Sequence, residues 1–474
     1  MILATLGIFM RFSSLFIVLS ALLGGFGLAN TAHSATKEPP NLSNGQFQQC
    51  LSELKHSSKF KGISSETFEK YRPSEPDPSV LVSLNYQPEF QKQVWDYLAG
   101  LVDEERVKDG IDAKKRLQGV LSRIEHRYGV SSEDVLGVWG VESNFGKQLG
   151  KKDLFQSLAT LSCFDRRQSY FRGEYAAALK IVQNGDIHAG DMKGSWAGAF
   201  GQTQFMPSTF LRLAQDFDGD GQKDLVNSEA DALASTANFL LKSGYRSGEP
   251  WGFEVKLPQN FWGESNRKTK QPIGYWRKQG VTLANGQALP NTLSSAGLLM
   301  PAGKNGPAFL VGKNFDAFYS YNASENYALA IAHLSEMIRQ NRTQNVGFVA
   351  PWPTDDPGIS RRQAREIQQA LLHRGYNIGA VDGMIGDNTR RAIQDFQRSQ
   401  GVNPDGRAGQ KLYRMLVNVN VAPQSYTPQS YAPQSYAPQS YTPQSYAPQS
   451  YAPNSHGGGV VTRLDDGRGV IISK

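Results

Sequence analysis

The segment from Val135 to Gly146, VLGVWGVESNFG, constrains the fold most strongly, because it predicts a helix with one acidic residue on its apolar stripe. Ser131 or Ser132 can cap this helix at its start, and Gly146 supplies a stop. Residues at the spacing i, i+3, i+4 and i+7 share one face of it: Val135, Val138, Trp139 and Glu142. The sequence therefore predicts a carboxyl group surrounded by apolar neighbours.

Such a carboxyl group loses solvation of its charged form, so its pKa is expected to rise. A proton held near neutral pH is what a general acid needs in order to protonate a leaving glycosidic oxygen. Glu142 is thus a candidate catalytic residue. The alternative is a glutamate at the edge of the core that is paired with a basic residue.

The length of 474 residues indicates a large domain with accessory modules. The net charge of +7 is modestly basic, but there is no run of like charges and no RNA-binding signature. Nucleic acid is therefore not the expected partner, whereas a polyanionic extracellular polymer fits the charge.

Residues 1–34 have the features of a signal peptide: one charge, Arg11, precedes the apolar stretch LFIVLSALLGGFGLA and a small-residue cleavage site at 32–34. The apolar stretch is short for a membrane span, although an uncleaved anchor is the alternative. No cysteine follows it before Cys50, so no lipid attachment is expected. We expect an exported, soluble, periplasmic protein.

Cys50 and Cys163 are the only cysteines. Because export permits a disulfide, a bridge between them is favoured over two unpaired buried thiols.

Residues 41–346 are expected to form one mainly helical domain. Six segments have helical spacing: 47–63, 89–110, 113–129, 170–185, 230–244 and 324–341. Between Trp251 and Tyr321, turn residues separate short runs such as FEVKL and AFLVG, which predicts a small β-rich insert. Residues 347–358 are a Pro-rich linker.

A second dense stretch, GSWAGAFGQTQFMPSTF, covers 194–210. Its small residues allow close approach of a ligand to the backbone, and neutral polar side chains beside aromatic rings suit a sugar: Ser195, Trp196, Gln202, Gln204 and Phe205. The alternative is a tightly packed junction between a helix and a loop.

Five ordered motifs carry a resemblance to a known family: GVWGVESNFG, LATLSCFDRRQSYF, GSWAGAFGQTQFMPSTF, DFDGDGQKDL and FYSYNASENYALAI. From about Phe47 to Met337 the chain resembles the membrane-bound lytic murein transglycosylase B family. The resemblance implies a lysozyme-like fold with a glycan cleft beside a single catalytic glutamate.

The same resemblance implies roles for individual residues. Glu142 corresponds to the catalytic glutamate, and six residues correspond to positions that bind substrate: Ser195, Gln204, Phe205, Tyr321, Asn322 and Tyr97. Phe239 stands where the family can carry a tyrosine, which keeps a stacking surface without the hydroxyl. Asp165, in its FDRR setting, is expected to form an ion pair.

The segment DFDGDGQKD has the opening of a calcium loop, with carboxylates at alternate positions and a glycine sixth. It departs from that pattern at position twelve, where Asn227 replaces the bidentate glutamate. The resemblance implies a structural Ca²⁺ held by five residues: Asp216, Asp218, Asp220, Gln222 through its carbonyl, and Asp231. The alternative is an acidic turn without metal.

Residues 359–418 contain two D-G-x-x-G patterns, at 381–397 and 404–417, and each leads into a helix. They resemble the small three-helix peptidoglycan-binding domain of cell-wall enzymes. Its expected core residues are Ile367, Leu371, Ala392, Ile393, Phe396 and Leu416. Residues 419–456 repeat PQSY and predict a disordered spacer, and residues 457–474 form a C-terminal tail of unassigned role.

The expected fold class is α+β and predominantly α: a lysozyme-like catalytic domain with a β-rich insert, plus the three-helix domain. The expected enzyme is a monomeric lytic transglycosylase that cleaves the MurNAc-GlcNAc β-1,4 bond of peptidoglycan glycan strands. It would form 1,6-anhydroMurNAc ends and need no cofactor for the chemistry. A hydrolytic muramidase and a non-catalytic wall-binding protein are the alternatives.

Overall fold

The computed structural model describes residues 40–83 and 92–417. The expected signal peptide 1–34, the PQSY repeat 419–456 and the tail 457–474 lie outside the described residues. Among the described residues, no helix is long and apolar enough to cross a membrane.

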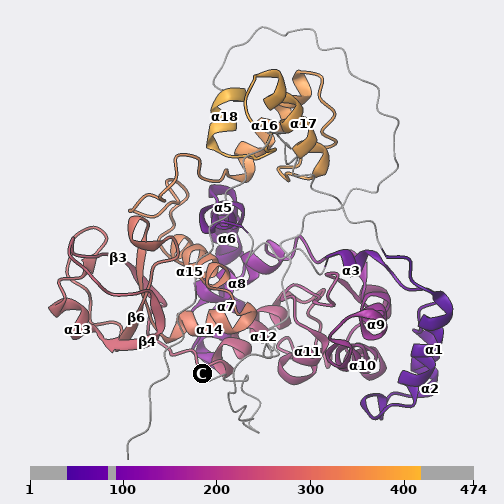
Figure 1. Cartoon of the computed structure of the whole chain (residues 1–474). Helices are drawn as coiled ribbons and strands as arrows, with labels where there is room; N and C mark the ends of the chain where they lie inside the picture. Colours follow the sequence, from indigo (N-terminus) through magenta and orange to yellow (C-terminus); the bar gives the residue numbers. More distant parts are fainter. Residues whose placement is uncertain (1–39, 84–91, 418–474) are drawn as a thin grey trace, which may run out of the picture. The chain divides into compact units, whose positions relative to one another are not determined.

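Helices dominate the larger domain, as the spacing predicts (Figure 1). They are α1 (Asn44–Lys55), α2 (Ser65–Lys70), α3 (Ser79–Ser83), α5 (Val94–Leu101), α6 (Glu104–Arg116), α7 (Gln118–Tyr128), α8 (Ser132–Ser143), α9 (Leu154–Phe164), α10 (Gln168–Asn184), α11 (Pro207–Leu213), α12 (Glu229–Lys242), α14 (Lys313–Asn322) and α15 (Glu325–Arg339).

The helical segment 89–110 is interrupted, because α5 ends at Leu101 and Asp103 then caps the start of α6. Its Oδ1 accepts a hydrogen bond of 2.8 Å from the backbone N–H of Arg106, which satisfies a donor at the start of α6. Segment 113–129 is likewise split at Leu117, between α6 and α7.

Helix α8 lies inside the domain and packs against α6, α7, α12 and α15. The sequence predicts one apolar face for this helix. Its residues from Asp134 to Ser143 are all buried, so the helix is covered by protein on every side. Close packing with α15 depends on a small residue. A Cβ on Gly137 would lie 2.1 Å from the Ser335 Oγ.

The β-rich insert is confirmed as a five-stranded antiparallel sheet in the order β4-β6-β7-β3-β5. Its strands are β3 (Gly252–Lys256), β4 (Asn266–Pro272), β5 (Thr282–Leu283), β6 (Ser295–Leu299) and β7 (Ala308–Val311), with helix α13 (Ile273–Lys278) beside them (Figure 1). In the central pair, Phe253 is opposite Leu310. The sheet has its own apolar cluster, which includes Val255, Trp276 and Leu298.

A disulfide joins Cys50 on α1 to Cys163 on α9, with 6.0 Å between the Cα atoms. The expected bridge is therefore confirmed. It ties together segments that are 113 residues apart in the sequence.

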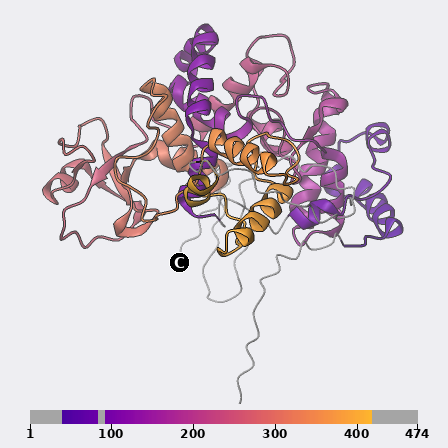
Figure 2. The same cartoon turned by 90° about the horizontal axis from the view of Figure 1, so that it is seen from above.

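Three helices follow the Pro-rich segment: α16 (Arg361–His373), α17 (Asp387–Ser399) and α18 (Gln410–Val417), seen from above in Figure 2. All six expected core residues are buried: Ile367, Leu371, Ala392, Ile393, Phe396 and Leu416. Charged contacts join this part to α5 and α6. The Arg361 Nε lies 2.7 Å from an oxygen of the buried Asp103 carboxylate, and the Arg407 Nη1 lies 2.5 Å from an oxygen of the Asp96 carboxylate.

Candidate active site

Helix α8 positions Glu142 in its last turn. Ser131 is the cap, since its Oγ accepts a hydrogen bond of 3.3 Å from the N–H of Asp134. The prediction that Gly146 stops the helix was wrong by two residues, because the helix ends at Ser143 and its C-cap is Asn144. The reason is that the chain already turns left-handed at Asn144, where φ is +50°.

Glu142 is 1 % exposed, and its Oε1 accepts a hydrogen bond from the hydroxyl of Tyr327 on α15. Burial and the neighbouring Glu142 hold the pKa of Tyr327 well above its ordinary value, so this hydroxyl keeps its proton and acts as a donor. Tyr321 and, to a smaller extent, Tyr97 on α5 raise the same pKa, which places these two residues near the pair.

Because its hydroxyl contacts Glu142 directly, Tyr327 is a candidate functional residue that the sequence did not single out. The signal was present in the helical spacing of 324–341, because Ser324 caps α15 and Tyr327 follows in its first turn. That spacing does not reveal that the first turn of α15 faces the last turn of α8.

The stretch 194–210 is held against α8 by the side chain and the backbone of Gln202. The Gln202 Oε1 accepts from the Trp139 indole at 3.0 Å, and the Gln202 backbone oxygen accepts from the Ser143 hydroxyl at 2.7 Å. The Gln202 Nε2 donates to the Val226 carbonyl at 3.0 Å. This amide therefore fixes the helix to the loop, as the packed-junction alternative expects.

Ser195 and Gln204 are buried in the same loop and shape its backbone. The Ser195 Oγ accepts from the Ala199 N–H at 3.1 Å. The Gln204 Nε2 donates to the carbonyls of Gly201 and Leu149 at 2.8 Å and 3.1 Å.

Phe205 and Tyr321 meet in an aromatic cluster that extends to the Glu142–Tyr327 pair. The ring of Tyr321 lies 5.9 Å from that of Phe205 and 6.3 Å from that of Tyr327, measured between centroids. The ring of Phe239 lies 4.4 Å from that of Tyr321, again between centroids. The structure thus brings Phe205, Tyr321 and Glu142 together.

Two buried polar atoms lie in this cluster's immediate surroundings. The Tyr321 hydroxyl donates to the Thr203 carbonyl at 2.9 Å, while the Oγ1 of Thr203 has no hydrogen-bond partner within the described residues. The Nδ2 of Asn322, next to Tyr321, also has none there. Buried polar groups are nearly always paired, so these two atoms are candidates for binding a polar ligand.

Asp165 is confirmed as an ion-pair residue. Its Oδ1 accepts from the backbone N–H of Arg167 at 2.6 Å and lies 3.5 Å from the Arg167 Nε. This carboxylate therefore already has a structural partner.

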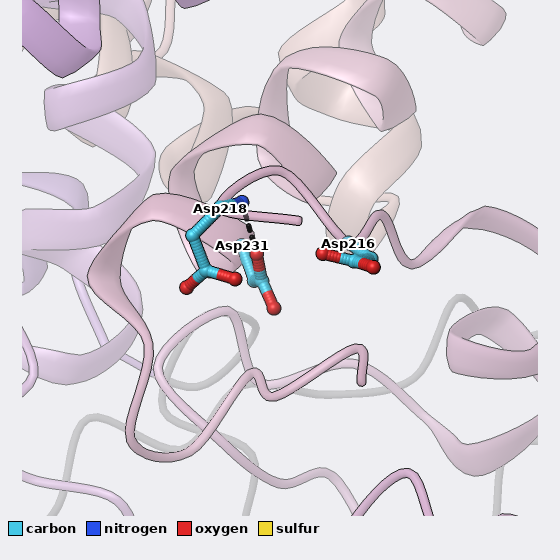
Figure 3. A group of neighbouring side chains, drawn as sticks. All are labelled: Asp216, Asp218 and Asp231. Atoms are coloured by element: carbon cyan, nitrogen blue, oxygen red, sulfur yellow. Dashed lines mark hydrogen bonds between the residues drawn. The ribbon is translucent and has the colours of Figure 1, made fainter. Parts of the chain in front are cut away.

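Three of the expected calcium ligands converge. Carboxylate oxygens of Asp216, Asp218 and Asp231 all lie within 4.8 Å of one another, and Figure 3 shows Asp231 between the other two. Burial raises the pKa of Asp231 even though backbone N–H groups donate to it, and the nearby Asp218 adds to the rise. Asp220 lies outside this group, and its Oδ1 accepts from the Gln222 N–H at 2.8 Å.

Residues 46–336 match the family described as "Transglycosylase SLT domain", which covers more than half of the chain. The chain belongs to this family. Residues 360–416 of the transglycosylase match a second family, described as "Putative peptidoglycan binding domain".

Relatives confirm the assignment as a lytic transglycosylase. The enzyme is 32 % identical over 254 residues to membrane-bound lytic murein transglycosylase B of Escherichia coli K12, covering 52 % of this chain and 68 % of that protein. It resembles SltB3 of Pseudomonas aeruginosa in complex with NAG-anhNAM-pentapeptide, with 43 % identity and a TM-score of 0.62. That match covers 78 % of this chain and 99 % of SltB3.

A third relative is the Escherichia coli transglycosylase SLT35 in complex with calcium. It is 29 % identical with a TM-score of 0.54, over 64 % of this transglycosylase and 95 % of SLT35. The expected lysozyme-like, mainly helical fold class is confirmed by these neighbours.

Proposed function

We propose that Glu142 is both the acid and the base of a transglycosylation that cleaves the MurNAc-GlcNAc β-1,4 bond. The protonated carboxyl gives its proton to the glycosidic oxygen as the bond from that oxygen to MurNAc C1 breaks. The resulting carboxylate then takes the proton of the MurNAc C6 hydroxyl as O6 bonds to C1. No water is consumed, and the product ends in 1,6-anhydroMurNAc.

The observation that carries this proposal is the burial of Glu142 beside a proton-holding hydroxyl. A buried carboxyl group is disfavoured in its charged form, which suits the acid step. A hydroxyl donor such as Tyr327 stabilises the carboxylate in the base step. Hydrolysis normally uses two carboxylates that flank the bond, and Asp165 is engaged with Arg167.

Substrate contacts are proposed for the residues around this pair. Asn322 and Thr203 would supply the polar contacts, because their buried side-chain atoms have no partner within the described residues. Phe205, Tyr321 and Tyr97 would supply aromatic surface for sugar rings. Ser195 and Gln204 would act mainly through the backbone that they shape.

Peptidoglycan is the proposed substrate and binding partner. SltB3, to which the chain is similar, was crystallised with a NAG-anhNAM-pentapeptide, and residues 360–416 match a peptidoglycan-binding family. We propose that the enzyme acts as a monomer in the periplasm after cleavage of residues 1–34. The Cys50–Cys163 disulfide is consistent with an oxidising compartment.

A structural Ca²⁺ is proposed at Asp216, Asp218 and Asp231, with Asp220 and the Gln222 carbonyl as further ligands. Converging carboxylate oxygens are the donors that Ca²⁺ prefers, and the similar SLT35 was crystallised with calcium. The ion would brace the loop before α12 and take no part in the chemistry.

The products released from purified peptidoglycan test this function. Mass spectrometry should find muropeptides with anhydro ends, lighter by one water than hydrolytic products. Reducing MurNAc ends would identify a muramidase instead, and no release would indicate a wall-binding protein without activity.

A further inference from the structure

Trp262 is the most exposed of the large hydrophobic side chains among the described residues, with 87 % of its surface accessible. It lies in the connection between strands β3 and β4. The sheet that these strands belong to has an apolar cluster of its own, separate from the cluster that contains α8. An indole that stays in water while the preceding Phe261 packs against the sheet is available to stack on a ligand.

The loop holds this indole between two anchored neighbours. The Phe261 ring packs 6.5 Å from the buried Trp276, and the Phe261 N–H donates to the Pro258 carbonyl at 3.0 Å. After Trp262, the Ser265 Oγ accepts from the Met300 N–H at 2.8 Å. The indole is therefore presented on a fixed segment of backbone.

Gly263 completes this arrangement. A Cβ at this position would lie 2.3 Å from the Phe261 ring, so a side chain there would displace the anchor. The sequence F-W-G thus places one ring against the sheet and the next ring in solvent.

The β-rich insert that carries Trp262 exposes mainly basic residues. The Lys304 Nζ lies 5.2 Å from the centre of the indole, close enough for a cation–π contact. Between residues 252 and 312, Glu264 is the single exposed acidic residue. Five basic residues are exposed there: Lys256, Lys268, Arg277, Lys278 and Lys304.

We propose that Trp262 and Lys304 form a further peptidoglycan-binding site, distinct from the site at Glu142 and from the domain at residues 360–416. The indole would stack on a sugar ring of the glycan, and the Lys304 ammonium would pair with a carboxylate of the stem peptide. This proposal rests on the proposed function, because its ligand is the substrate of that function. The charge complementarity favours this polyanionic glycan over a neutral one.

Sedimentation with purified peptidoglycan tests the site, using the full chain with Glu142→Gln so that the polymer stays intact. Adding Trp262→Ala should weaken binding ~3- to 10-fold, the range expected for loss of one aromatic contact. Trp262→Phe should restore part of the binding. Tyr275→Ala removes another exposed ring, 43 % accessible, from the same subdomain and should leave binding unchanged.

The role of Lys304 is tested with peptidoglycan before and after enzymatic removal of the stem peptides. Lys304→Ala should weaken binding to the intact polymer, and the effect should shrink on the stripped glycan and in high salt. Equal binding by Trp262→Ala and its parent would overturn the proposal, as would equal losses from Trp262→Ala and Tyr275→Ala. A loss seen only with phosphatidylglycerol vesicles would also overturn it, by indicating a lipid surface.

These outcomes can be distinguished from a failure of the proposed function. Failure of the wild-type enzyme to release anhydro products would refute the function while leaving the binding comparison intact. Thermal melting of each variant shows that it is folded, since truncating an exposed side chain leaves the core unchanged.

Discussion

The hydroxyl of Tyr327 donates a hydrogen bond to Oε1 of Glu142, which joins the first turn of α15 to the last turn of α8. Tyr327 is 2 % exposed, and burial together with Glu142 holds its pKa well above the ordinary value. The pair therefore consists of a carboxyl group and a donor that keeps its proton. A change in the charge of the Glu142 carboxyl group during turnover would therefore act directly on the hydrogen bond from this hydroxyl.

Tyr327→Phe should lower kcat ~10- to 100-fold, because a hydrogen bond to a charged group contributes ~1.5–3 kcal/mol. The measurement is the release of soluble muropeptides over a range of pH, with melting temperature as a check on folding. Tyr175→Phe is the matched control, since the buried Tyr175 hydroxyl has no hydrogen-bond partner within the described residues. Equal activity of the two variants would show that the Glu142 contact does not assist turnover.

Gly137→Ala should destabilise the fold by ~1–3 kcal/mol, because the added Cβ would lie 2.1 Å from the Ser335 Oγ. Adding Ser335→Ala should restore part of this loss by removing that oxygen. Chemical denaturation of the two single variants and the double variant measures the coupling. Strictly additive effects would contradict close packing of α8 on α15 at this point.

Calcium should raise the melting temperature, since a ligand bound only to the folded state stabilises it by ~2.7 kcal/mol at 100 times its Kd. Asp216→Asn combined with Asp218→Asn should abolish this shift. Glu229→Gln removes a charge that is paired with Arg116 beside the loop, and it should leave the shift intact. A calcium response that persists in the double variant would place the ion elsewhere.

Stability should depend on pH through Glu174. Burial raises its pKa above the ordinary value of 4.5, although the Ser208 N–H and hydroxyl donate to it at 2.9 and 2.7 Å. The native state then binds more protons than the unfolded chain above that value. The contribution of Glu174 protonation to the free energy of unfolding is complete below pH 4.5 and is lost as the pH rises through the folded-state pKa.

Glu174→Gln removes this titration and keeps the shape of the side chain. The free energy of unfolding of this variant, relative to wild type, should therefore increase from about pH 4.5 to about pH 7. A difference that is constant over this range would contradict the assignment.

The helices and the β-rich insert could be predicted because their periodicities are local. The boundaries at Asp103 and Leu117 could not, since apolar spacing continues across them and only the cap at Asp103 marks the break. The disulfide was predicted only as the favoured pairing of two cysteines. Its formation depends on α1 and α9 lying side by side, which no local pattern specifies.

The candidate site was partly predictable for the same reason. Glu142, Phe205 and Tyr321 belong to compact motifs, so their residue types could be recognised one motif at a time. Tyr327 and Thr203 lie in the same motifs, but what they contact depends on distant segments: α15 with α8, and the 194–210 loop with α14. The burial of α8 on every side also depends on helices that surround it in space.

The most direct test of the central claim is the product analysis of Glu142→Gln. Glutamine keeps the size and hydrogen-bonding shape of the side chain but cannot give or take the proton. Loss of general acid catalysis costs ~10²–10⁴-fold, and the base step would fail as well. The folded variant should bind purified peptidoglycan and release essentially no anhydro-ended muropeptides by mass spectrometry, whereas near-normal release would contradict the assignment of Glu142.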